Sequence, residues 1–135
     1  ALETEFHRGL NLVYDPSPDV AYLAKQGILM LNVALTTEKN KAGSHIQTWE
    51  PFTKYLFEEV LNPLGVPYVF LGKDASRYKR YAGIFSHVFT VSHPASASYK
   101  GVDWDSEGVF TKADTLIYEN NGYSINWLKD CEDPF

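Results

Sequence analysis

The stretch HVFTVSHPASASYKG (residues 87–101) decides how the rest of the chain is interpreted. Its first half is apolar and β-branched, as in a strand buried within a sheet, and that half ends at His93. A proline and a run of small residues follow the histidine. A buried strand that ends on an ionisable side chain marks a place to look for chemistry, because ligands of parallel sheets bind beyond the strand ends.

Two further apolar runs resemble it, namely GILMLNVAL (residues 27–35) and VPYVFLG (residues 66–72). Neither alternates strictly between polar and apolar residues, which is typical of strands covered on both faces. Segments with helical spacing lie between the runs, and TWEPFTKYLFEEVLN (residues 48–62) predicts an amphipathic helix with Thr48 as its N-cap and Pro51 in its first turn. Helices are also expected at residues 3–10, 76–83 and 109–122. This order predicts an α/β fold with a parallel sheet.

Length and composition are those of one ordinary globular domain over residues 1–135, with 44% hydrophobic and 21% charged residues. The chain carries no long apolar span, and we expect no signal peptide. We therefore expect an intracellular protein, cytoplasmic in a bacterium or virus and nuclear or mitochondrial in a eukaryote. The single cysteine, Cys131, excludes a disulfide framework and a cysteine metal site within the chain.

The net charge of -5 argues at first against a nucleic-acid partner. Residues 70–100 differ from the rest, because they hold five basic residues and one acid and so carry +4 (5 minus 1). The basic residues are Lys73, Arg77, Lys79, Arg80 and Lys100. From charge alone, a solvated face and a phosphate-binding surface explain this stretch equally well.

Polar features end all three apolar runs. Asn32 follows the first run's apolar core, Gly72 and Lys73 follow the second, and His93 ends the third. Each residue taken alone fits a structural role, as a buried amide, a turn or a strand-end histidine. Their occurrence together at three neighbouring strand ends favours a binding or catalytic site.

Several of these segments together resemble the uracil-DNA glycosylase family. In chain order they are LAKQGILMLNVALT (23–36), AGSHIQTWEPFT (42–53), YVFLGKDA (68–75), VSHPASAS (91–98), VFTKADTLI (109–117) and INW (125–127). The resemblance implies a three-layer α/β/α fold around a four-stranded parallel sheet. It also implies hydrolysis of the N-glycosidic bond of deoxyuridine flipped out of DNA, as in base excision repair. The implied partner is uracil-containing DNA, single- or double-stranded, and no metal, organic cofactor or membrane is expected.

The resemblance also assigns roles by position. His93 matches the catalytic histidine, which would donate a hydrogen bond to uracil O2 as charge develops on the leaving base. Asn32 matches the asparagine whose amide reads the uracil edge. Gly72 and Lys73 match a phosphate-binding loop, and Ser44 and His45 match a pair with a supporting role.

The small residues after His93 are expected to contact DNA, through Ser96, Ala97 and Ser98. Ala97 stands where the family carries a leucine that wedges into the base stack. Because alanine is a poor wedge, we expect weaker flipping from duplex DNA and relatively better use of single strands.

The family's water-activating motif, Gly-Gln-Asp-Pro-Tyr-His, does not occur in these 135 residues. In the family's topology the strand leading into it lies inside the sheet, so the chain is expected to lack one interior strand. Three explanations stay open: the C-terminal part of a glycosylase that needs an upstream segment for activity, a diverged non-catalytic uracil- or DNA-binding domain, or an interaction protein such as the partner of a DNA-mimicking inhibitor. Within the chain, Asp103 and Asp105 are the best-placed carboxylates to act as a base.

Overall fold

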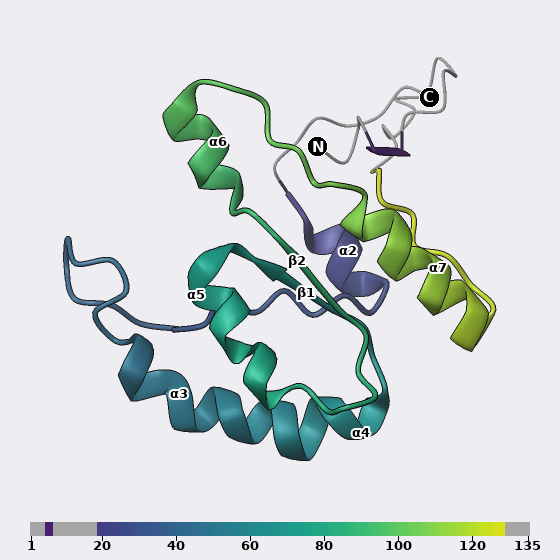
Figure 1. The fold of residues 1–135 in the computed structure, drawn as a ribbon, viewed down its shortest axis with the longest axis horizontal. Helices are drawn as coiled ribbons and strands as arrows, with labels where there is room; N and C mark the ends of the chain where they lie inside the picture. The colour runs from purple at the N-terminus through teal and green to yellow at the C-terminus, as the bar shows by residue number, and fades with distance from the viewer. Residues whose placement is uncertain (1–4, 7–18, 129–135) are drawn as a thin grey trace.

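The computed structural model describes residues 5–6 and 19–128 (Figure 1). Most of the helix expected at residues 3–10, together with Cys131, lies outside the described residues. Within the described part, no helix is long and apolar enough to cross a membrane.

Helices account for most of the regular structure. The elements in chain order are α2 (Ala21–Lys25), α3 (Ile46–Tyr55), the π-helix η1 (Leu56–Leu61), α4 (Asn62–Leu64), β1 (Tyr68–Leu71), α5 (Gly72–Ser76), the 3-10 helix η2 (Arg77–Tyr81), β2 (Val88–Val91), α6 (Pro94–Lys100) and α7 (Val109–Asn121). In Figure 1, α3 and α4 lie on one side of the strands, whereas α2 and α7 lie on the other.

The two strands β1 and β2 pair in parallel, with Tyr68 opposite Val88 and Leu71 opposite Val91. A parallel pair needs a crossover connection, and α5 followed by η2 provides it. The predicted α/β class and two of the three predicted strands are therefore confirmed. Each observed strand is a few residues shorter than its apolar run.

The strand predicted at residues 27–35 is wrong for this structure, because the segment is irregular and pairs with no strand among the described residues. In Figure 1 it runs as a coil from α2 past the strands to the loop before α3. Its side chains remain apolar but are largely exposed, with Leu29 at 61% and Leu35 at 52% of their maximum. An extended segment becomes a strand only when a neighbour accepts its backbone hydrogen bonds.

The long helical segment starts earlier than predicted. Trp49 donates its backbone N–H to the carbonyl of His45, so the helix begins at Ile46 with His45 as N-cap, and Thr48 is not the cap. Pro51 consequently lies inside α3 and not in its first turn. The last predicted helix is confirmed as α7, which ends before Gly122 with φ +75°, a backbone conformation that favours glycine.

The core consists of two aromatic-rich clusters. The first joins η1, β1 and η2 through Phe57, Tyr68, Phe70 and Tyr78. The second joins α2 to the chain after α7 through Leu23, Ile125 and Trp127. The irregular segment touches both, because Val33 packs on the first and Ile28 on the second. No large side chain in the described part is completely buried, so the core is shallow.

Two buried tyrosines of the first cluster differ in their hydrogen bonds. The Tyr68 hydroxyl donates to Oδ1 of Asn62 at 2.7 Å, whereas the Tyr78 hydroxyl has no partner among the described residues. Burial raises the pKa of both phenols, and at Tyr78 the neighbouring Tyr81 and Asp74 raise it further. Both side chains are therefore neutral in the folded protein at ordinary pH.

This difference predicts that removing the phenol hydroxyl destabilises the protein at Tyr68 but not at Tyr78. Tyr68→Phe removes a formed hydrogen bond, so the free energy of unfolding should fall by about 0.5–1.5 kcal/mol. Tyr78→Phe removes only an unpaired hydroxyl, so the free energy of unfolding should stay the same or rise. Urea unfolding followed by circular dichroism would measure both, and a larger loss at Tyr78 than at Tyr68 would contradict the assignment.

Candidate functional site

A cavity of about 740 Å³ lies at the carboxyl ends of the two strands. It is an open cleft on the surface and not an enclosed pocket. The lining residues come from β2, from the segments after both strands and from the loop before α7: Gly72, Lys73, Ser76, Arg77, Thr90, Val91, Ser92, His93, Ser96 and Glu107. The cavity is thus where the sequence places a site, at the strand ends.

Strand register brings Gly72 and His93 together. Each follows closely after a strand end, and those ends, Leu71 and Val91, are paired. A Cβ atom built on Gly72 would lie 2.9 Å from Cβ of His93, closer than real side-chain contacts allow. Gly72 also has φ +90°, which side chains disfavour. Only glycine therefore permits this approach of the two segments.

The imidazole of His93 is held by the helix that follows it. His93 is the N-cap of α6, and its Nδ1 accepts the backbone N–H of Ala95 at 3.1 Å. A ring nitrogen that accepts a hydrogen bond carries no proton, so this contact assigns the proton of a neutral ring to Nε2. Nε2–H is then a donor available to a ligand in the cavity.

The loop predicted after His93 is instead the short helix α6. Pro94 occupies its first turn, where the missing N–H costs nothing, and Ser96 donates both its backbone N–H and its hydroxyl to the His93 carbonyl. Ala97 is buried at 8% exposure, so its side chain is directed into the protein. The prediction that Ala97 belongs to the DNA-contacting stretch stays a prediction. Because its side chain is buried, a leucine there would overpack the interior instead of projecting as a wedge.

Trp104 anchors the segment that follows β2 through a hydrogen bond. Its indole N–H donates to the carbonyl of Ser92 at 2.9 Å, directly before His93. Its ring makes an edge contact with Phe110, which in turn packs on Trp127 of the second cluster. The position of His93 is thus coupled to the core. In the sequence, the only indication of this link is that Trp104 is an aromatic residue within a polar loop.

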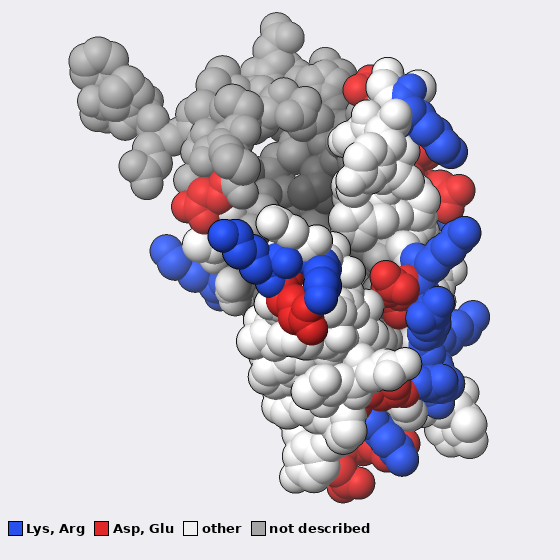
Figure 2. Space-filling view, turned by 90° about the vertical axis from the view of Figure 1, so that its left-hand side faces the viewer, with Lys and Arg blue, Asp and Glu red and all other residues white. Residues whose placement is uncertain are grey.

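Charges of both signs line the cavity, with Lys73 and Arg77 on one side and Glu107 as the acid. Arg77 forms an exposed ion pair with Asp74 at 3.7 Å, and exposed pairs of this kind contribute little to stability. Lys73 has no ion-pair partner among the described residues. Figure 2 shows Lys and Arg side chains along the right-hand edge of the molecule and in a second group left of its centre, with acids among both.

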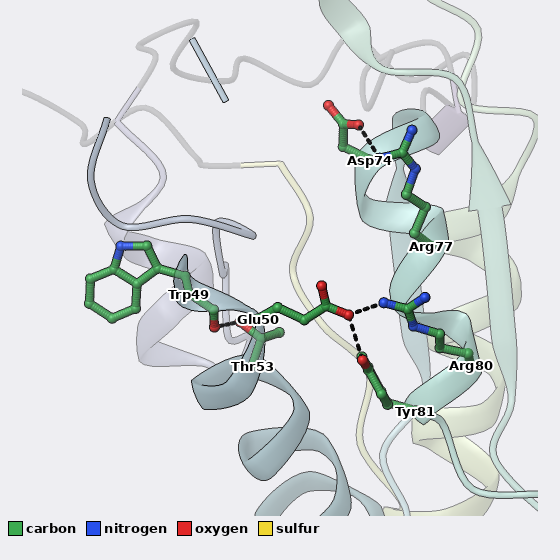
Figure 3. A network of polar contacts seen from close by, with 7 residues as sticks. All are labelled: Trp49, Glu50, Thr53, Asp74, Arg77, Arg80 and Tyr81. Atoms are coloured by element: carbon green, nitrogen blue, oxygen red, sulfur yellow. Dashed lines mark hydrogen bonds and ion pairs between the residues drawn. The ribbon is translucent and has the colours of Figure 1, made fainter. Parts of the chain in front are cut away.

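A second polar network ties α3 to η2. Arg80 forms an ion pair with Glu50, and the hydroxyl of Tyr81 donates to the same carboxylate oxygen at 2.6 Å (Figure 3). Figure 3 also shows the Asp74–Arg77 pair one turn away on the same helical segment. Of the five basic residues that the sequence singles out, Arg77 and Arg80 are therefore engaged within the protein, and Lys73 is the lysine that reaches the cavity.

Asn32, Ser44, His45 and Ser98 do not line this cavity. Asn32 is exposed in the irregular segment. Ser44 and His45 order the loop that follows it: Ser44 Oγ accepts the backbone N–H of Glu38 at 2.8 Å, and His45 Nδ1 lies 2.9 Å from Thr36 Oγ1. The structure therefore joins His93, Gly72, Lys73 and Ser96 in one site and leaves the other predicted residues outside it.

The site predicted from the sequence omitted six lining residues, Ser76, Arg77, Thr90, Val91, Ser92 and Glu107. The first two follow Gly72 and Lys73 by four residues, a spacing that puts them on the same face once the segment is helical. Glu107 depends on its backbone, with φ +53° and its N–H donated to Oδ1 of Asp105 at 2.8 Å. Asp105 therefore caps a turn, and neither it nor Asp103 reaches the cavity.

No cluster of three His, Cys, Asp or Glu that could hold a metal occurs in the described part of the chain.

Comparison with known proteins adds independent information. No family model matches the chain. Curated relatives named uracil-DNA glycosylase are 36% identical in Leuconostoc citreum and 37% in Streptococcus pneumoniae, each over 118 residues and 84% of this chain, and 35% in Pseudomonas aeruginosa over 131 residues and 91%. The matched regions cover 52%, 53% and 54% of these relatives, so the chain spans about half of their length. The resemblance predicted from the motifs is thus confirmed.

The contact between Gly72 and His93 predicts a specific effect of one methyl group. In Gly72→Ala the added Cβ should displace the imidazole and break its bond to Ala95, so the Nε2–H tautomer should lose its preference, as ¹⁵N NMR of the ring would show. Gly65→Ala is the matched control, because Gly65 also has positive φ but has no atom within 4 Å of an added Cβ. An unchanged His93 ring spectrum in Gly72→Ala would contradict the prediction.

Proposed function

We propose that this chain is part of a uracil-DNA glycosylase, which hydrolyses the N-glycosidic bond of deoxyuridine flipped out of DNA. The observation that carries the proposal is His93, an imidazole with Nε2–H free to donate at a cavity formed by parallel strand ends. The curated relatives carry the name of this activity over most of the chain's length.

In the proposed reaction His93 stabilises the leaving group. As the glycosidic bond breaks, negative charge develops on the uracil ring, and Nε2–H donates a hydrogen bond to O2. A neutral imidazole suits this task, because the donor is preorganised and needs no proton transfer. Trp104 and Gly72 act as positioning residues, since one holds the residue before His93 and the other leaves room for its ring.

DNA phosphates are proposed to bind beside this imidazole. Lys73 offers a positive charge at the cavity, and Ser96 lines it from the first turn of α6, where its hydroxyl would have to leave the His93 carbonyl in order to donate to a phosphate. Ser98 is exposed on the same helix and offers a second hydroxyl. Contacts of this kind set the position of the DNA without reading its sequence.

Asn32 is proposed to read uracil, because an amide offers one acceptor for N3–H and one donor for O4. It lies in the irregular segment, outside the cavity around His93. We propose that the rest of the protein provides a strand that pairs with this segment and brings Asn32 towards the site, with Ser44 and His45 ordering the loop behind it. The exposed apolar residues Leu29 and Met30 and the greater length of the relatives support this.

The rest of the protein is also proposed to carry the carboxylate that activates the attacking water. No carboxylate of the described chain other than Glu107 lines the cavity, and Glu107 follows a tight turn. The complete protein should therefore release uracil from DNA, whereas the 135-residue chain alone should not.

Uracil release by the complete protein tests the proposal most directly. His93→Ala should slow release by about 100- to 1,000-fold, the usual effect of removing one preorganised donor, while DNA affinity changes little. Single-turnover assays with labelled oligonucleotides would measure release, and fluorescence anisotropy would measure affinity. Equal losses in both would contradict the leaving-group role, and binding without release in the parent protein would identify a non-catalytic uracil- or DNA-binding domain.

Asn32→Ala should affect discrimination between bases. Without the amide, uracil loses two hydrogen bonds, so the ratio of kcat/KM for uracil over cytosine should fall by at least about tenfold. Asn120→Ala is the matched control, because Asn120 is an exposed amide within α7, a helix in which alanine is well tolerated. An unchanged ratio in Asn32→Ala would show that another residue reads the base.

A further inference from the structure

The carboxylate of Glu5 joins two residues that lie 101 and 106 positions further along the chain. Its Oε1 accepts the backbone N–H of Thr111 at 2.6 Å, and its Oε2 accepts the hydroxyl of Ser106. Ser106 is buried, with an exposure of 4%. Because a buried hydroxyl needs a hydrogen-bond partner, Glu5 meets a requirement of the loop that precedes α7.

The beginning of α7 has no capping side chain of its own. Its N-cap residue is Gly108, and its first turn holds no acidic residue. The first N–H groups of a helix lack partners within the helix, and this end carries a partial positive charge. A carboxylate that accepts the N–H of Thr111 provides both a partner and a negative charge. The start of α7 therefore depends on Glu5, a residue from a distant part of the chain.

Phe6 makes a second contact with the same region. Its ring stacks on Trp127, with the ring centroids 5.5 Å apart and the planes inclined by 6°. Trp127 packs on Phe110 of α7, and Phe110 makes an edge contact with Trp104. Two adjacent residues thus hold the region around the start of α7, one through hydrogen bonds and the other through aromatic packing.

The loop between α6 and α7 carries two residues of the site. Trp104 donates its indole N–H to the carbonyl of Ser92, which directly precedes His93. Glu107 lines the cavity with φ +53°, a backbone conformation that residues other than glycine rarely adopt. Such a conformation persists only where surrounding contacts hold it, and Ser106 lies directly before it. The bond from Ser106 to Glu5 is one of these contacts.

We propose that Glu5 and Phe6 are positioning residues for His93. They hold the loop before α7, the loop holds Trp104, and Trp104 holds the carbonyl just before the histidine. The inference rests on the proposed function only for the task of His93 in the reaction, since the orientation of its ring is measured without DNA. Neither Glu5 nor Phe6 lines the cavity, so the rate of uracil release should change and DNA affinity should not.

The first measurement is ¹⁵N NMR of the His93 ring in the complete protein. Glu5→Ala removes both hydrogen bonds of the carboxylate, so the ring should lose part of its preference for the Nε2–H tautomer. The difference in ¹⁵N shift between its two nitrogens should then shrink. Ser106→Ala removes only one of these bonds and should give a smaller change in the same direction. Glu58→Ala removes an exposed carboxylate of η1 and is the matched control, with an unchanged spectrum.

A double variant tests whether the effect passes through Trp104. Trp104→Phe keeps an aromatic ring but removes the N–H donated to Ser92, so it should shrink the same shift difference. Adding Glu5→Ala to Trp104→Phe should change the spectrum little further, because residues that act through one shared contact are not additive. Fully additive changes would show that Glu5 does not act through the indole, and would overturn the proposed route.

The second measurement is single-turnover release of uracil by the complete protein. Glu5→Ala should slow release by about 2- to 30-fold, the usual range for residues that act on a site through others, with unchanged DNA affinity. An unchanged His93 spectrum in Glu5→Ala would overturn the proposal even if the parent releases uracil. Should Glu5→Ala not fold, as circular dichroism would show, Ser106→Ala decides by the same criterion. If the spectrum changes but the parent releases no uracil, the positioning holds and only the proposed function fails.

Discussion

The parallel pairing of β1 with β2 is the constraint on which the site depends. Because Leu71 is paired with Val91, the chain leaves both strands at the same edge, and Gly72 meets His93 there. The contact is close enough that a single methyl group on Gly72 would collide with the histidine. A slip of one residue in this register would turn His93 to the other face of the sheet and remove it from the cavity.

Around this contact, the imidazole is oriented by backbone and not by charge. The N–H of Ala95 assigns the ring's tautomer, and Trp104 holds the carbonyl just before it. Trp104 leads through Phe110 to the second aromatic cluster, so the orientation of His93 depends on packing well outside the cavity. Such an arrangement favours electrostatic stabilisation by a fixed donor, because little reorganisation is needed when charge develops.

The two aromatic clusters meet through a segment that has no partner strand within the described part of the chain. Residues 28–35 are as apolar as the two observed strands, but Leu29, Met30 and Leu35 remain exposed. Apolar surface of this kind costs free energy in water and is normally covered. A strand that paired with the segment would bury these side chains and order Asn32 at the same time, so stability and the proposed role of Asn32 would depend on one event.

The sequence by itself determined the α/β class, the positions of the two strands and the helix α7, because these follow from short-range patterns of apolar and polar residues. The same apolar pattern predicted a strand at residues 27–35, and that prediction is wrong for this structure. A strand needs a neighbouring strand to accept its backbone hydrogen bonds, and a local sequence pattern does not specify that neighbour. Only the tertiary structure decided that Ala97 is buried and that Glu107 lines the cavity. These outcomes depend on helix phase and on contacts between distant segments, which residue types and spacing alone do not specify.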